Sequence, residues 1–291
     1  MLRVCFCFVA VATACATTLA PPAAKPAPDS LEALRAAYSR PPAEWPAPTI
    51  DAGVAFAELG RVERTPPPGD PAGKARITLG TTLFFDPRLS GSGQIACASC
   101  HDPDLAFADG RTTSFGHGRT ELRRNSPSLW NVGAVPRLFW DGRADSLEAQ
   151  ALMVFENADE MHGSGEHVVR TLASSRGYRE LFAQAFGDPE PTLERALAAL
   201  AAFERTLQSD GSSAFDAFLA GRHEALDDAA LRGLHLFRTK ARCANCHHGP
   251  LLTDHGFHDL GLSYYGRKLE DLGRYRVTGD PADVGRFKTP S

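Results

Sequence analysis

The chain has 291 residues, of which 43% are hydrophobic and 23% are charged. This length accommodates two domains of ordinary size, and the hydrophobic share is sufficient for real cores. The net charge of −4 gives no reason to expect a nucleic-acid partner. We therefore expect a folded protein that does not bind nucleic acid.

The first twenty residues have the pattern of an export signal. Arg3 supplies a positive charge, Val4 to Ala14 form a short apolar run, and small residues follow. The run is too short to span a bilayer, and a buried N-terminal strand is the structural alternative. Cys15 is an alternative site for a lipid anchor. The sequence thus predicts a signal peptide over residues 1–20 and a periplasmic protein.

Residues 21–74 are rich in alanine and proline, with the runs PPAAKPAP, RPPAEWPAP and TPPPGDP. A stretch of this composition is expected to bury little surface, so it is interpreted as a linker or as an arm lying on the protein. One short helix is predicted within it, over residues 31–38.

From about residue 75 the chain is expected to be globular and mainly α-helical. The clearest predicted helix covers residues 192–207, where four leucines share one face and Thr192 can cap the N-terminus. Residues 146–155 and 227–237 are further helical candidates. Long alternating strand patterns are absent, so we expect short helices separated by long loops.

Four of the seven cysteines lie outside the signal segment, and all four belong to two C-x-x-C-H motifs. The motifs consist of Cys97, Cys100 and His101, and of Cys243, Cys246 and His247. Two thiols and an imidazole can bind zinc, form a redox dithiol or attach a haem.

Spacing separates these three alternatives. The motifs begin 146 positions apart (243 − 97), whereas the paired motifs of zinc ribbons lie about 15–20 residues apart. A redox dithiol does not require the histidine. The C-x-x-C-H pattern is the attachment signature of c-type haem, in which each thiol adds to a vinyl group and the histidine binds iron. We therefore predict two covalently bound c-type haems.

A faint internal repeat accompanies the motifs. Residues 80–84 and 233–237 both read G-x-x-L-F and are followed by a loop and C-x-x-C-H. This pattern favours two cytochrome-c-like units, although two matching apolar positions can also arise by chance. We expect a first haem domain over residues 75–220 and a second over residues 221–291.

Several segments resemble the bacterial di-haem cytochrome c peroxidases and their MauG-type relatives. The segments are LGTTLFFDPRLSGSGQIACASCH, SFGHG, RRNSPSLWN, FWDGRA, AAFERTL, CANCHHGPLLTDHGFHDLGL and GRFKTPS, and they span residues 75–291. The resemblance implies reduction of hydrogen peroxide to water with electrons from a small periplasmic cytochrome c or copper protein. It places the peroxide site at the N-terminal haem and the entry of electrons at the C-terminal haem, with a homodimer as one arrangement.

The resemblance also implies roles for individual residues. The implied haem-iron ligands are His101, His247 and His117, the last as a displaceable distal ligand of the first haem. Trp140 would lie between the haems, Gln150 and Glu160 in the distal pocket with Glu160 as acid–base group, and Asn125 at a calcium ion. Without the resemblance, His117 would be interpreted as a loop histidine and Trp140 as core packing. Glu160 would be interpreted as part of a solvated loop, and Asn125 as a turn residue or helix cap.

The resemblance also concerns the end of the chain. The three methionines all precede the second motif, and the family places a Met or Tyr ligand and calcium-binding carbonyls downstream of GRFKTPS. We expect a C-terminally truncated chain with an incomplete second haem domain and a weakened calcium site. Substitute sixth ligands would come from His255, His258, Tyr264 or Tyr265.

Three functions remain open at this point. The first is a di-haem peroxidase. The second is a MauG-type oxidase acting on a protein substrate, and the third is a di-haem electron carrier without chemistry of its own. Peroxide turnover with a reduced donor separates the first from the third.

Overall fold

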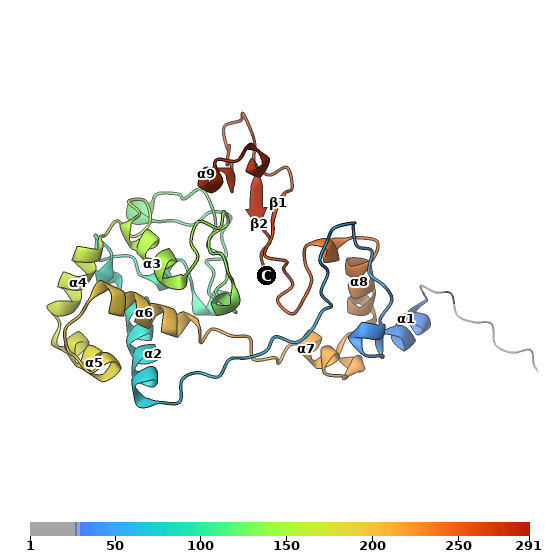
Figure 1. Cartoon of the computed structure of the whole chain (residues 1–291), viewed down its shortest axis with the longest axis horizontal. Coiled ribbons are helices and arrows are strands. Elements are labelled where there is room, and N and C mark those ends of the chain that lie inside the picture. The colour runs from blue at the N-terminus through green and yellow to red at the C-terminus, as the bar shows by residue number, and fades with distance from the viewer. Residues whose placement is uncertain (1–26, 28–29) are drawn as a thin grey trace, which may run out of the picture.

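The computed structural model describes residue 27 and residues 30–291 (Figure 1). The predicted signal peptide and Cys15 lie outside the described residues. The described part is mainly helical, with α-helices, short 3-10 turns and one two-stranded sheet. None of the helices in this part is long and apolar enough to cross a membrane.

Residues 71–207 form the larger group of helices, here called the first lobe (left in Figure 1). Its helices are α2 (Pro71–Phe84), α3 (Leu147–Glu156), α4 (Gly165–Ala173), α5 (Arg176–Phe186) and α6 (Leu193–Glu204). Helix α2 packs closely on α6, because a Cβ atom at Gly80 would lie 1.9 Å from the carbonyl oxygen of Ala199. Only glycine permits this approach of the two backbones. Next to it, the rings of Phe84 and Phe203 lie 5.0 Å apart.

The helix starts follow from local capping. The side chains of Ser146, Thr192 and Asp227 accept hydrogen bonds from backbone N–H groups three residues ahead. The four helices predicted from sequence correspond to α1 (Leu31–Tyr38), α3, α6 and α8 (Asp228–Arg238), whereas α4, α5 and the short helices α7 (Ala214–Leu219) and α9 (Tyr275–Thr278) were not predicted. Helix α6 ends at Glu204 rather than at residue 207, but Leu207 is still buried in the turn that follows.

The second lobe consists of residues 31–59 and 214–254 (right in Figure 1). It contains α1 (Leu31–Tyr38), α7 (Ala214–Leu219) and α8 (Asp228–Arg238), and α1 packs against α8. The core of this lobe joins side chains of both segments, namely Leu34, Tyr38, Trp45, Leu59, Phe218, Leu226, Leu231 and Leu234. This part of the Pro-rich stretch therefore buries more surface than its composition predicted.

A buried arginine ties the Pro-rich segment to α8. Arg238 is fully buried, pairs with Glu58, and donates from Nη2 to the carbonyl oxygen of Pro46 at 2.9 Å. Its guanidinium lies 5.2 Å from the ring centre of Trp45. A buried charge is tolerated only when it is paired and hydrogen-bonded, so these contacts hold the segment in place.

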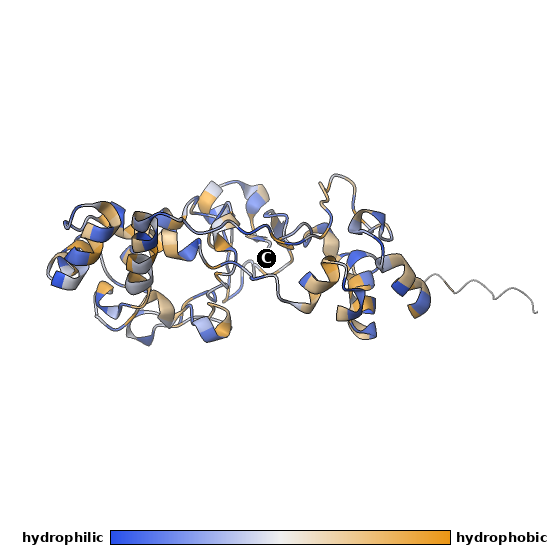
Figure 2. Cartoon of the chain, turned by 90° about the horizontal axis from the view of Figure 1, so that it is seen from below, coloured by the Kyte–Doolittle hydropathy of each residue, from blue (hydrophilic) through white to orange (hydrophobic). Residues whose placement is uncertain are grey.

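The C-terminal part of the chain reaches from the second lobe to the first. Strands β1 (Phe257–Asp259) and β2 (Arg286–Lys288) pair antiparallel, and α9 (Tyr275–Thr278) precedes β2. The N–H of Lys288 donates to the carbonyl oxygen of Trp140 at 2.8 Å, and Arg274 donates to the carbonyl oxygens of residues 141 and 142. Figure 2 shows apolar and polar residues alternating around the helices at both ends of the molecule, as amphipathic packing requires.

Candidate active site

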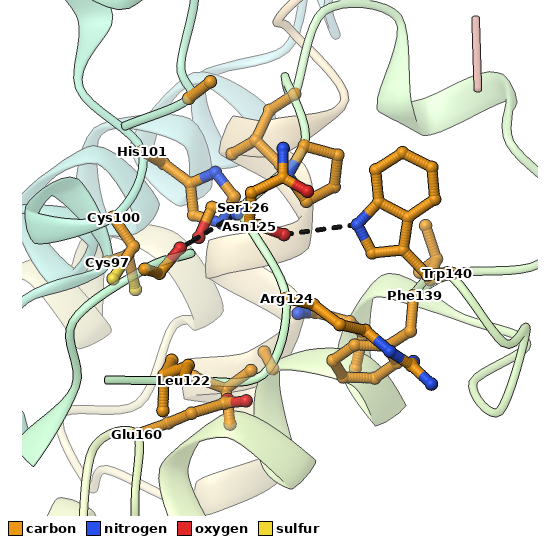
Figure 3. A pocket seen from close by; sticks show the side chains of 18 of the residues that line it. Cys97, Cys100, His101, Leu122, Arg124, Asn125, Ser126, Phe139, Trp140 and Glu160 are labelled. Atoms are coloured by element: carbon orange, nitrogen blue, oxygen red, sulfur yellow. Dashed lines mark hydrogen bonds between the residues drawn. The ribbon is translucent and has the colours of Figure 1, made fainter. Parts of the chain in front are cut away.

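A cavity of about 660 Å³ is lined mostly by the first lobe and partly by the C-terminal segment (Figure 3). Seven residues predicted from sequence to form the site line it, namely Cys97, Cys100, His101, Asn125, Trp140, Gln150 and Glu160. This volume is in the range of cofactor and ligand pockets, whose walls are mostly apolar with a few placed polar groups. The structure thus brings most of the predicted first site together in one cavity.

The first C-x-x-C-H motif forms a 3-10 turn over Cys97–Ser99. The Nδ1 atom of His101 lies 2.8 Å from the carbonyl oxygen of Phe107, to which it donates. This bond places the ring proton on Nδ1, so Nε2 is the nitrogen that can bind a metal. Burial lowers the pKa of His101, so the ring is in the neutral form that binds metal ions.

The second motif repeats this geometry in the other lobe. Residues Cys243–Asn245 form a 3-10 turn, and Nδ1 of His247 donates to the carbonyl oxygen of Leu252 at 2.9 Å. The G-x-x-L-F repeat is less regular, because Leu83 is 1% exposed whereas the equivalent Leu236 is 47% exposed. The structural repeat therefore resides in the motifs themselves more than in the helices before them.

The Pro-rich segment wraps the second motif. The side chain of Asn245, inside the motif, accepts from the N–H of Asp51 at 2.7 Å and donates to the carbonyl oxygen of Thr49 at 3.1 Å. The N–H of Gly249 donates to Ala57 at 3.0 Å. This segment is therefore part of the wall around Cys243, Cys246 and His247.

The thiols of the first motif are in an environment that keeps them neutral. Burial, reinforced by Glu204, raises the pKa of Cys97 to about 12, and burial also raises the pKa of Cys100. A redox dithiol needs a thiolate, which positive or polar surroundings stabilise, so the raised pKa values argue against this alternative. The pairing of two thiols with a neutral imidazole fits the attachment of a haem.

Glu160 lies in the turn after α3, on the opposite side of the cavity from His101 (Figure 3). Its N–H donates to the carbonyl oxygen of Asn157 at 3.1 Å, which fixes the turn. Burial raises the pKa of the Glu160 carboxyl, while nearby Arg143 opposes the shift. A carboxyl with a raised pKa inside a pocket is suited to accept and release protons near neutral pH.

His117 is beside this cavity and is not one of the residues that line it. Its ring stacks on that of His162, with centroids 4.2 Å apart. The adjacent Gly116 does line the cavity, so the loop that carries His117 forms part of the wall.

Trp140 makes hydrogen bonds through both its side chain and its backbone. Its ring nitrogen donates to the carbonyl oxygen of Asn125 at 3.2 Å (Figure 3), and its own carbonyl oxygen accepts from Lys288 in β2 at 2.8 Å. Strand β2 pairs with β1, which follows the second motif along the chain. Trp140 therefore connects the first cavity with the segment that follows His247 along the chain.

The expected calcium at Asn125 finds no support in the described residues. Asn125 offers one amide oxygen, whereas calcium takes six to eight oxygen ligands. In the described part of the chain, the one group of three His, Cys, Asp or Glu ligands is Cys246, Asp254 and His258 at the second motif.

Two features of the first site were missed from sequence. Glu204, at the end of α6, lines the cavity, and burial raises its pKa to about 8. Its presence among buried apolar residues in AAFERTL was the available signal.

The second feature is Arg124, which donates to both oxygens of Asp271 and to Asp141, so that the C-terminal segment is clamped to the cavity rim. These partners are far apart in sequence, and no local pattern predicts the clamp.

Comparisons with known proteins agree with this geometry. Residues 74–224 match the family model described as di-haem cytochrome c peroxidase. The chain is therefore a member of the di-haem cytochrome c peroxidase family. Such membership makes it a haem-dependent oxidoreductase of the peroxidase class.

Individual relatives carry both names found in this family. The chain is 43% identical to methylamine utilization protein MauG of Methylorubrum extorquens, over 83% of this chain and 68% of the relative. It is 37% identical to cytochrome c551 peroxidase of Nitrosomonas europaea, over 84% and 74%.

Solved structures extend the likeness to the fold. A MauG-like protein associated with microbial copper homeostasis matches with a TM-score of 0.68 and 31% identity, over 84% of this chain and 75% of that one. The diheme peroxidase BthA of Burkholderia thailandensis matches with a TM-score of 0.66 and 27% identity, over 84% and 73%. The mainly helical fold predicted from sequence is thus confirmed.

Proposed function

We propose that this peroxidase reduces hydrogen peroxide to water in the first-lobe cavity, with electrons arriving by way of the second C-x-x-C-H motif. One observation carries the proposal. A single cavity combines an imidazole whose Nδ1 is held by a backbone carbonyl with a buried carboxyl of raised pKa on the opposite side. Cleavage of a peroxide needs both an open metal position and a group that moves a proton.

Haem is the cofactor that the cavity and the family support. Thioethers at Cys97 and Cys100, and at Cys243 and Cys246, would attach two haems, with His101 and His247 as the proximal ligands. Bound haem would supply the redox-active iron at which the O–O bond is cleaved.

Glu160 performs the proton transfer in this proposal. Its carboxylate takes the proton from the near oxygen of the peroxide and delivers it to the far oxygen, which leaves as water. The half-buried Gln150, on α3, lines the same cavity and orients the peroxide by hydrogen bonding. Burial favours this role, because it brings the pKa of Glu160 closer to the working pH.

Two further residues have proposed roles. Trp140 couples the two sites, because it bonds to the first cavity through Asn125 and to β2 through Lys288. His117 gates the first site as a displaceable ligand of its iron, carried on a loop between Gly116 and Gly118.

The surroundings of the enzyme are proposed from sequence alone. Residues 1–20 would direct export to the periplasm, with Cys15 as an alternative lipid anchor. The donor would be a small cytochrome c or copper protein, and the enzyme a homodimer. Calcium at Asn125 stays a prediction.

The test is steady-state peroxide reduction with a pre-reduced small cytochrome c as donor. Glu160→Gln should lower turnover by about 10²–10⁴-fold while both haems stay bound, as mass spectrometry reports. Glu156→Gln is the matched control, since Glu156 is exposed at the end of α3 and should leave turnover unchanged. Full activity of Glu160→Gln would remove this residue from the proton transfer.

The MauG-type alternative deserves a separate outcome, because two relatives with that name are 43% and 41% identical. An oxidase of a protein substrate would consume peroxide slowly with small donors. It would instead leave oxidised side chains on a partner protein. Rapid turnover with the small donor would exclude both this alternative and the electron carrier.

A further inference from the structure

The rings of His117 and His162 lie face to face beside the cavity. Their centroids are 4.2 Å apart, and their planes differ by 8°. The Nδ1 atom of His117 is buried and has no hydrogen-bond partner among the described residues. A buried nitrogen without a hydrogen-bond partner raises the free energy of His117 in this position, whereas ring stacking lowers it. The two effects oppose each other, so His117 is held at this position without being locked there.

His162 is the better fixed of the two histidines. Its backbone has a φ of +49°, which is strained for a residue other than glycine. Its N–H donates to the carbonyl oxygen of Asn157 at 2.9 Å, and its Nδ1 donates to that of Ala158 at 3.0 Å. The surrounding turn therefore imposes this conformation and presents the ring as a platform. The same turn carries Glu160 into the cavity.

The loop of His117 is held to this turn at the backbone, where the N–H of His117 donates to the carbonyl oxygen of Asp159 at 2.8 Å, and it contains a glycine at which the chain can rotate. Gly118 has a φ of +62°, a region that glycine enters freely. A Cβ atom at Gly116 would lie 1.9 Å from the carbonyl oxygen of Asp159, so the loop also packs closely on the turn. Because Gly116 lines the cavity and His117 does not, a rotation within this loop would carry the imidazole from the platform into the cavity.

We propose that His162 is a positioning residue that holds His117 outside the first cavity and so keeps the iron site open to peroxide. The inference rests on the proposed role of His117 as a displaceable ligand. His117 then has two positions, one stacked on His162 and one in the cavity, and the stack sets the ratio between them. A stacked ring pair is worth about a twofold to tenfold change in that ratio.

The experiment measures the spin state of the first haem by EPR in the oxidised holoprotein, and fluoride affinity as a second readout. His162→Ala should raise the ratio of low-spin, His117-ligated haem to high-spin haem about twofold to tenfold, and weaken fluoride binding accordingly. His162→Phe keeps an aromatic ring and should return both readouts towards the wild type. His167→Ala, which removes a partly buried histidine of α4 whose Nε2 bonds to the carbonyl oxygen of Arg88 and to neither stacked ring, is the matched control and should change neither.

The background variant His117→Gly separates the two levels of the proposal. In this background His162→Ala should have no effect, because the mobile ligand is gone. If His117→Gly changes the spectrum of the first haem but His162→Ala and His162→Phe both match the wild type, the role of His162 is wrong. If His162→Ala produces low-spin haem that persists in the His117→Gly background, His117 is not the ligand, and both its proposed role and this inference fail.

Discussion

Replacement of Glu204 by glutamine should change how the stability of the protein depends on pH. The carboxyl is 7% exposed, and its Oε2 atom has no hydrogen-bond partner among the described residues. Burial raises its pKa from 4.5 to about 8. The folded state therefore keeps a proton that the unfolded state releases between these two pH values. Because the unfolded state binds fewer protons in this window, stability falls as the pH rises.

The size of the effect follows from the shift. Each pKa unit corresponds to about 1.4 kcal/mol. At pH 7, ionisation of Glu204 in the unfolded state therefore lowers the free energy of unfolding by about 3 kcal/mol. Glutamine occupies a similar volume and does not ionise. Glu204→Gln should therefore have little effect near pH 4.5 and should stabilise the protein by up to about 3 kcal/mol at pH 7.

Urea unfolding at a series of pH values between 4.5 and 8 measures this difference. The matched control is Glu194→Gln, at an exposed position of the same helix, whose effect should be small at every pH. A stability difference between Glu204→Gln and the wild type that stays constant across the series would refute the reasoning. It would mean that Glu204 is ionised in the folded protein.

Two further predictions concern the helix contact and the tryptophan. Gly80→Ala places a Cβ atom 1.9 Å from the carbonyl oxygen of Ala199 and should destabilise the protein by about 3 kcal/mol in urea, whereas Gly177→Ala, which meets only a distant side chain, should be neutral or stabilising. Equal effects of the two would contradict the close helix contact. Trp140→Phe removes the hydrogen bond to Asn125 and should slow electron transfer between the haems in stopped-flow experiments, with each haem spectrum nearly intact. An unchanged rate would mean that Trp140 only packs against its neighbours and does not take part in electron transfer.

The sequence predicted what short segments determine. The caps at Ser146, Thr192 and Asp227 and the amphipathic face of α6 were sufficient to place those helices, because capping and helical periodicity are local properties. The two C-x-x-C-H motifs likewise form the same local structure, a 3-10 turn followed by a histidine whose Nδ1 bonds to a backbone carbonyl oxygen. Seven residues of the cavity could be named from sequence because the resemblance to a known family carries information about tertiary structure.

Long-range packing accounts for what was missed. The segment around Trp45 looked like a linker, because its proline content conceals that it packs against α8 and around the second motif. The burial of Glu204 and the stack of His117 on His162 depend on which helices and turns meet, and no local pattern reports this. The clamp between Arg124 and Asp271 joins segments 147 residues apart and is equally invisible in sequence.

The central claim is that this chain uses haem to reduce peroxide with electrons from an external donor. The most direct measurement adds a known amount of hydrogen peroxide to the mature holoprotein with an excess of reduced small cytochrome c, and counts the donor oxidised. Two donor equivalents should be oxidised for each peroxide, and the rate of this oxidation should fall about 10²–10⁴-fold in Glu160→Gln. Oxidation of the donor no faster than without the protein would contradict the account.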